Sequence, residues 1–169
     1  DILFTLKNDD ITANVSTTLN AYVDAQDEEK DATKSCNAAK TKLRTAQKAL
    51  AKAQVALENA REDAQERQED DPDYVLDEEP YKAAINAAQA SVESAQETVD
   101  ALEKNQKKAA QNTASAKAAY KKATKKESKL TVKATAAGTI DSLAIDKGAA
   151  VSSSSDKAAM KIIDTKDIV

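Results

Sequence analysis

Few residues of this chain carry side chains that do chemistry. Its 169 residues include no histidine and a single cysteine, Cys36. One chain therefore cannot build a zinc site from the usual ligands, and catalytic triads that depend on histidine are excluded. Ten carboxylates crowd into residues 62–79, an acidic stretch that has no sign of a pocket around it. We expect no enzyme activity, no cofactor and no metal site.

The composition indicates long helices. Hydrophobic residues make up 41% of the chain, but 35 of them are alanines, and the chain has one Phe and no Trp. A single compact core needs larger side chains than these. Glycine and proline, which break helices, are limited to Gly138, Gly148, Pro72 and Pro80. This composition excludes a transmembrane bundle, a disulfide scaffold and a collagen-like chain. The net charge of −4 argues against a nucleic-acid partner.

The helix-breaking glycines and prolines divide the chain into a strand, a helix, a turn, a second helix and a small β region. Within both helical stretches, small or apolar residues recur at alternating steps of three and four, which predicts a coiled coil. The predicted seam of the first helix is Ile11, Val15, Thr18, Tyr22, Ala25, Glu29, Ala32, Cys36, Ala39, Leu43, Ala46, Leu50, Ala53, Leu57, Ala60 and Ala64. That of the second is Tyr81, Ile85, Ala88, Val92, Ala95, Val99, Leu102, Gln106, Ala109, Thr113, Ala116, Tyr120 and Ala123.

The short link between the helices predicts an antiparallel hairpin with its tip near residues 70–80. Charge suggests a register: folding the chain about residue 74 or 75 brings an acidic stretch at 24–31 to a lysine-rich stretch at 117–126. Cys36 is expected to be a small buried hydrophobic residue of the seam. Glu29 and Gln106 are expected to set the register or to be partly exposed.

The predicted tip carries three hydrophobic residues between its two prolines, namely Tyr74, Val75 and Leu76. Pro72 ends the first helix, and Pro80 is tolerated in the first turn of the second. One interpretation is that the three hydrophobic residues fold back and close the end of the coil. The other is that they contact a partner protein.

Beyond Leu130 the pattern changes to short strands separated by turns. Their apolar positions are Val132, Ile140, Leu143, Ile145, Val151, Ile162 and Ile163. Gly138 and Gly148 are both expected in tight turns that need a positive φ.

Three segments of this region carry a resemblance: 134–140 (Ala-Thr-Ala-Ala-Gly-Thr-Ile), 145–151 (Ile-Asp-Lys-Gly-Ala-Ala-Val) and 160–164 (Met-Lys-Ile-Ile-Asp). Together they resemble the second half of a biotinyl/lipoyl-like domain, and residues 1–10 resemble the end of its first half. A lipoyl-like domain split by a long helical hairpin is similar to the membrane fusion proteins, the periplasmic-type adaptors of the HlyD-like and macrolide-efflux class.

The resemblance implies an α+β fold, in which a long antiparallel two-helix coiled-coil hairpin (8–129) is inserted in a small β domain (1–7 plus 130–169). It implies an adaptor subunit of a bacterial efflux or export pump, which performs no chemistry and couples an inner-membrane transporter to an extracytoplasmic conduit. The implied partners are an ABC-type transporter permease and further copies of the chain, in a hexamer in many such adaptors. The start at Asp1, inside an expected strand, suggests a fragment whose membrane anchor lies elsewhere. The implied location is extracytoplasmic, attached to the cytoplasmic membrane.

The tip departs from the family pattern. Members that dock to a TolC-type outer-membrane channel carry an Arg, Leu and Ser constellation flanking the tip, and residues 69–80 have no matching spacing. We therefore expect no such channel partner and an adaptor of a Gram-positive-type bacterium. The ten lysines between Lys104 and Lys133 are read either as solvated helix faces or as surfaces that line a conduit and pack adaptors together.

Two lysines of the β region invite a functional interpretation. Lys147 lies in a lipoyl-like turn that resembles a pore-lining gate, although an ordinary hairpin turn explains it too. Lys157 follows Asp156 in a motif that resembles a lipoate attachment site, but it lies in the second half of the domain, where an ordinary surface turn is expected. Two other functions stay open: a structural coiled-coil surface or stalk protein with no transport role, and a lipoyl-type carrier of a multienzyme complex.

Overall fold

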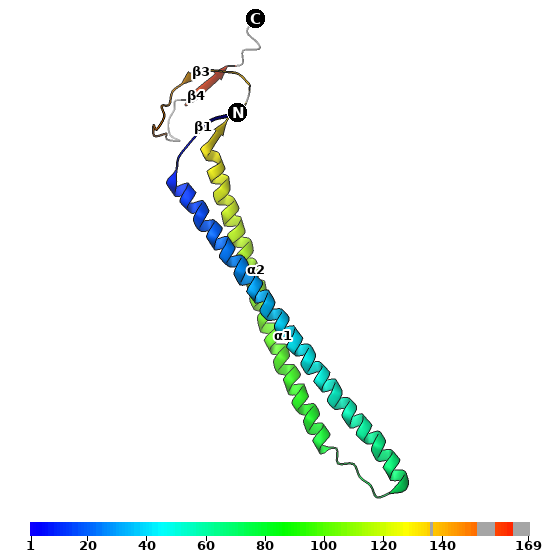
Figure 1. The fold of residues 1–169 in the computed structure, drawn as a ribbon. Coiled ribbons are helices and arrows are strands. Elements are labelled where there is room, and N and C mark those ends of the chain that lie inside the picture. The colour runs from blue at the N-terminus through cyan, green and yellow to red at the C-terminus, as the bar shows by residue number, and fades with distance from the viewer. Residues whose placement is uncertain (136, 152–157, 164–169) are drawn as a thin grey trace. The chain divides into compact units, whose positions relative to one another are not determined.

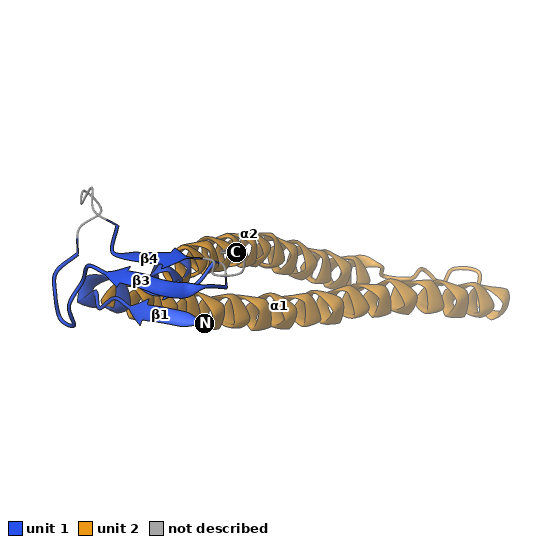
Figure 2. Cartoon of the chain, turned by 90° about the horizontal axis from the view of Figure 1, so that it is seen from above, with its two compact units in different colours: residues 1–12, 125–169 blue, residues 13–124 orange. Residues whose placement is uncertain are grey.

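The computed structural model describes residues 1–135, 137–151 and 158–163. Two long helices and a few short strands follow the predicted order, in agreement with the α+β class (Figure 1). The elements are β1 (Ile2–Thr5), α1 (Asp9–Asp70), α2 (Glu79–Glu127), the 3-10 helix η1 (Ser128–Leu130), β2 (Thr131–Lys133), β3 (Thr139–Leu143) and β4 (Met160–Ile163). The chain divides into two compact units, one of residues 1–12 and 125–169 and the other of residues 13–124 (Figure 2).

Each long helix is preceded by a residue whose side chain accepts a hydrogen bond from a backbone N–H group at the start of the helix. At the start of α1, Asn8 Oδ1 accepts a hydrogen bond from the N–H of Ile11 at 3.0 Å. Before α2, Asp77 Oδ1 accepts from the N–H of Glu79 at 3.1 Å. Pro80 follows in the first turn of α2, where its missing N–H is not needed. These contacts satisfy donors that a helix N-terminus leaves free.

The two helices pack along the predicted seam. Every predicted seam position is buried or half-buried in the structure, while the flanking positions are mostly exposed. Cys36, at 1% exposure, is the most buried residue of the hairpin, and Val99 follows at 4%. Most other buried side chains of the seam are alanines. The seam therefore buries little apolar area in each layer, and its stability depends on many small contributions.

The register of the hairpin differs from the one that charge suggested. Folding about residue 74 or 75 would place Ala25 opposite residues 123–125, but Thr113 Oγ1 donates to the carbonyl oxygen of Ala25 at 2.9 Å, about ten residues earlier. Lys40 pairs with Glu103 at 2.7 Å, in agreement with this register. In the described chain, no ion pair joins the acidic stretch 24–31 to lysines 117–126. Exposed ion pairs are too weak to select a register against the seam.

Polar and aromatic contacts specify the register that forms. Gln106 Nε2 donates to Thr33 Oγ1 at 3.1 Å across the seam. The rings of Tyr22 and Tyr120 stack with their centroids 6.2 Å apart. Gln106 thus acts as a register residue, as expected, because a slipped pairing would leave its half-buried amide without this partner.

The described residues of the β unit form two separate two-stranded antiparallel ladders, β1 with β2 and β3 with β4. In the first, Phe4 lies opposite Val132 and Thr5 opposite Thr131. The backbone N–H of Leu6 also donates to the carbonyl oxygen of Leu130 at 2.7 Å. The chain segments before α1 and after α2 are thus joined directly. Ile145 and Val151, predicted among the strands, lie outside them.

The two glycines of this unit serve different purposes. Gly148 has φ 86° and is the third residue of a turn that closes with a 3.1 Å bond from the N–H of Ala149 to the carbonyl oxygen of Asp146. The prediction of a positive φ at Gly138 is wrong, because Gly148 is the glycine for which the structure records one. A Cβ on Gly138 would lie 2.5 Å from the carbonyl oxygen of Ile163. Close approach of the β4 backbone, rather than turn geometry, requires a glycine there.

We expect Gly138→Ala to disrupt the β3–β4 ladder, because the added methyl group meets backbone atoms that cannot yield without separating the strands. Gly148→Ala is the matched control. Its methyl group has nothing within 4 Å, so only the left-handed backbone is strained, at a cost of about 1 kcal/mol. Amide hydrogen exchange of β3 and β4 measures both effects. Equal protection in the two variants would contradict the close-approach explanation.

Candidate functional site at the hairpin tip

The two helices end at different levels at the tip of the hairpin. The start of α2 lies opposite Arg61, which pairs with Glu78, whereas α1 continues for nine more residues to Asp70 (Figure 1). The loop 71–78 then runs back along this overhanging end of α1, and Gln68 Nε2 donates to the carbonyl oxygen of Tyr74 at 2.8 Å. Ala64, beyond the reach of α2, is nonetheless only 7% exposed. The returning loop therefore shields Ala64, whereas residues 65–70 at the end of α1 are exposed.

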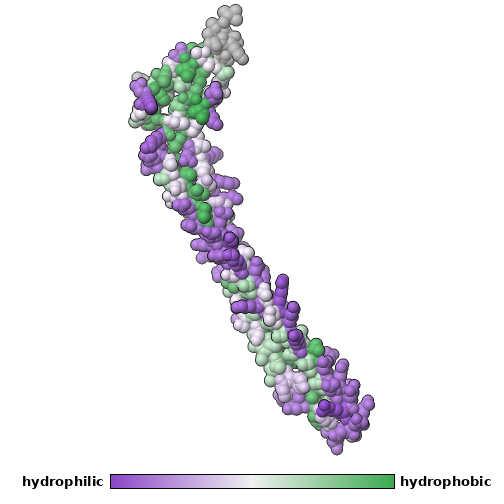
Figure 3. All heavy atoms as spheres, in the orientation of Figure 1, coloured by the Kyte–Doolittle hydropathy of each residue, from purple (hydrophilic) through white to green (hydrophobic). Residues whose placement is uncertain are grey.

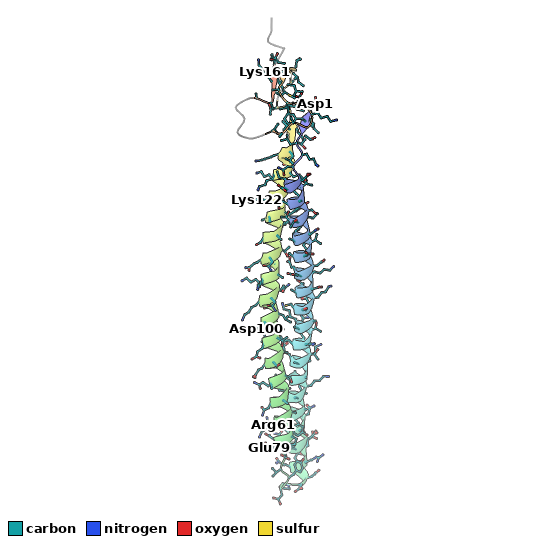
Figure 4. The ribbon with its side chains drawn as sticks, turned by 90° about the vertical axis from the view of Figure 1, so that its left-hand side faces the viewer. Asp1, Arg61, Glu79, Asp100, Lys122 and Lys161 are labelled. Carbon is teal, nitrogen blue, oxygen red and sulfur yellow. The ribbon has the colours of Figure 1, made fainter. Side chains whose placement is uncertain are left out.

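A three-residue ionic clamp holds the loop to both helices. Arg61 of α1 binds Glu78 through two bonds, Nε to Oε1 at 2.7 Å and Nη2 to Oε2 at 3.0 Å. Lys82 of α2 approaches the same carboxylate at 3.2 Å. Figure 4 labels Arg61 and Glu79, the residue that follows Glu78, and the two lie close together at this end of the hairpin. A bidentate arginine–carboxylate pair restrains direction as well as distance, so the clamp sets where α2 begins relative to α1.

The clamp lowers the pKa of the Glu78 carboxyl to about 2, first through the hydrogen bond from Arg61 and then through that from Lys82. The same bond raises the pKa of the Arg61 guanidinium. A carboxyl whose folded-state pKa is lowered stabilises the fold above its unfolded pKa of about 4.3. This contribution is lost as the pH falls through the folded-state pKa.

We expect the Glu78 carboxyl carbon to titrate in NMR with a midpoint near pH 2 in the folded protein. Arg61→Gln should move this midpoint upward toward the ordinary value, because the largest cause of the lowered pKa is removed. Arg67→Gln is the control, since Arg67 contacts the Tyr74 ring instead, at 5.5 Å from its centroid. An ordinary midpoint in the unaltered protein would show that the clamp does not form in solution.

The three hydrophobic residues of the tip differ in their exposure to solvent. Tyr74 and Leu76 are half-buried, whereas Val75 is 83% exposed. Tyr74 is held in place by Arg67 over its ring and by Gln68 at its carbonyl oxygen. Two of the residues thus cover the end of the coil, and Val75 remains as the accessible apolar group at the tip.

The surface around Val75 is acidic. Ten carboxylates and one basic residue, Arg67, lie between Glu62 and Glu79. This end of the hairpin is hydrophilic in the space-filling view (Figure 3). Arg67 contacts Tyr74 and Arg61 is bound to Glu78. A partner that approaches the tip therefore meets strong negative charge around one small apolar side chain.

Lys147, the other predicted site residue, belongs to the β unit. It is exposed in the turn that Gly148 completes. It also lines a cleft of about 880 Å³ in this unit, together with apolar side chains of β1, β3 and β4 such as Phe4, Leu143 and Met160. The predicted attachment motif at Lys157 lies outside the described residues.

Sequence reasoning missed the clamp and the overhang. Arg61 stands next to the acidic stretch 62–79, and a base beside many acids is a signal for a structural ion pair. It does not say which carboxylate is the partner. That choice depends on the level at which α2 starts, which no spacing within either helix encodes.

Comparisons with protein-family models, curated protein sequences and solved structures find no match for this chain. Within the residues that the structure describes, no helix combines the length and the apolarity needed to cross a membrane.

Proposed function

We propose that this chain is part of the adaptor subunit, or membrane fusion protein, of a bacterial export pump. The observation that carries the proposal is the closure of a long hairpin by the β1–β2 ladder, with further strands following in the same unit. This arrangement supports the interpretation of the strands as a lipoyl-like β domain into which the hairpin is inserted. The half-buried and buried seam supports the coiled-coil character of the hairpin.

In this proposal the adaptor performs no chemistry and couples an inner-membrane transporter of the ABC type to an extracytoplasmic conduit. The acidic tip, which lacks the Arg, Leu and Ser spacing of channel-docking members, supports a pump without a TolC-type partner. Self-association is part of the proposal, because the alanine-rich seam buries little area within one hairpin. The subunit is placed outside the cytoplasm, attached to the cytoplasmic membrane.

Purification of the tagged full-length protein from native membranes tests the proposal. We expect an ABC permease to co-purify and its ATPase rate to change when the adaptor is added. A transporter absent from repeated preparations, with the protein bound instead to cell-wall material, would overturn the proposal in favour of a structural stalk.

Two residue-level tests follow from the proposed assembly. If the turn at Lys147 lines an opening, Lys147→Glu should change transport, whereas Lys147→Arg, which keeps the charge, should not.

If the tip contacts a partner, Val75→Asp should weaken that contact, and Val55→Asp, a change at an exposed position of α1 away from the tip, should not. Unchanged transport in Lys147→Glu and unchanged co-purification in Val75→Asp would refute these two roles.

A further inference from the structure

One face of α2 carries lysines without any acid among them. Between positions 104 and 122 there are six lysines and no Asp or Glu. All six are exposed. They are Lys104, Lys107, Lys108, Lys117, Lys121 and Lys122. Counted from the seam, five of them occupy positions that point away from α1, and Lys117 lies at the edge of the seam. We call this set the lysine face.

The hairpin itself does not neutralise the lysine face. Among the described residues, none of the six has a carboxylate oxygen within 4.0 Å of its ammonium group. The pairing of Ala25 with Thr113 and of Tyr22 with Tyr120 places Lys117 to Lys122 beside the uncharged stretch 17–23 of α1. This register leaves Lys117 to Lys122 without a facing acid. It places the acidic stretch 24–31 beside positions 107–114, but neither Lys107 nor Lys108 forms an ion pair with that stretch within 4.0 Å.

The chemistry of the lysine face favours a soluble polyanion over a membrane surface. The outward positions between Lys108 and Lys121 hold Gln111, Ala114, Ser115 and Ala118. Helices that lie in a membrane interface bury large apolar or aromatic side chains there, and this face has none. It offers charge along a straight line, which suits a linear partner.

The acidic stretch 24–31 of a second copy is a weaker match for this face. The acidic stretch of α1 at 24–31 contains Lys30 and is followed by Lys34, which already pairs with Asp31 at 3.0 Å. The stretch therefore carries less net negative charge than its carboxylate count suggests. A phosphate polymer has no such internal compensation.

We propose that the lysine face of α2 binds a linear, phosphate-rich polyanion. The lysines form two groups, 104–108 and 117–122, whose nearest members are about 14 Å apart along the helix at ~1.5 Å per residue. One long polymer reaches both groups, whereas a short one fills only one of them. Binding should therefore strengthen with polymer length through effective concentration. This inference does not depend on the proposed export function.

Titration of the intact chain with long-chain polyphosphate tests the proposal. We expect binding that weakens with salt, with a slope of log affinity against log salt of about −4 for six lysines. Tripolyphosphate should bind at least tenfold more weakly. The triple variant K104Q/K107Q/K108Q should lower the affinity for long polyphosphate and reduce the slope to about −2, and K117Q/K121Q/K122Q should do the same.

The control variant is K42Q/K48Q/K52Q, which removes three exposed lysines from α1 and the same charge. It should bind as the unaltered chain does, and all variants should melt normally. Equal loss in the control would reduce the effect to net charge and overturn the proposal. So would stronger binding to phosphatidylcholine–phosphatidylglycerol vesicles than to polyphosphate, or self-association that the same lysine variants abolish without any polyphosphate binding.

Discussion

Replacing Val99 by aspartate is expected to lower the melting temperature of the hairpin by roughly 6–12 °C. Val99 is 4% exposed on the seam of α2. The variant loses apolar burial and places a carboxylate in the buried seam, at a cost of about 3 kcal/mol or more. Because buried side chains are few in this thin coil, neighbouring layers cannot compensate for one lost contact. Circular dichroism at the helical minimum, followed during heating, measures the effect.

Val55→Asp is the matched control for this prediction. It makes the same chemical change within the other helix, α1, but Val55 is 52% exposed. We expect a change within about 0.5 kcal/mol, as for ordinary surface substitutions. Similar melting temperatures for the two variants would show that α2 does not present the predicted face to α1.

The single native thiol allows a direct measurement of the hairpin register. Cys36 lies between Thr33, which bonds to Gln106, and Lys40, which pairs with Glu103. Leu102 and Gln106 are therefore the seam residues of α2 at its level. We expect Leu102→Cys or Gln106→Cys to form an intramolecular disulfide with Cys36 under mild oxidation. A faster-migrating band on a non-reducing gel would report it.

Thr113→Cys distinguishes this register from the one that charge suggested, which places Cys36 opposite residues 112–114. In the structure Thr113 contacts Ala25, about 16 Å along the helix from Cys36 at ~1.5 Å per residue. Cysteines whose Cα atoms are more than about 7 Å apart do not bridge without backbone movement. Preferential cross-linking of Thr113→Cys would therefore overturn the register described above.

The sequence by itself determined the elements of this protein and the faces that the helices bury. The scarcity of glycine and proline indicated two long helices, and every position that the three-and-four spacing predicted for the seam is buried or half-buried. These features are local, because helix-breaking residues and the spacing of apolar residues determine structure over a few neighbouring residues of the chain. The existence of the later strands followed from the same kind of signal.

Only the tertiary structure decided how the two helices align. A heptad pattern repeats, so many registers bury the same seam, and the charged stretches at 24–31 and 117–126 favoured a pairing that does not form. The register is specified by contacts between residues far apart in sequence: Gln106 with Thr33, Thr113 with Ala25, and Arg61 with Glu78. The overhang of α1, the returning loop over it, and the exposure of Val75 follow from that alignment, because each depends on where α2 starts beside α1.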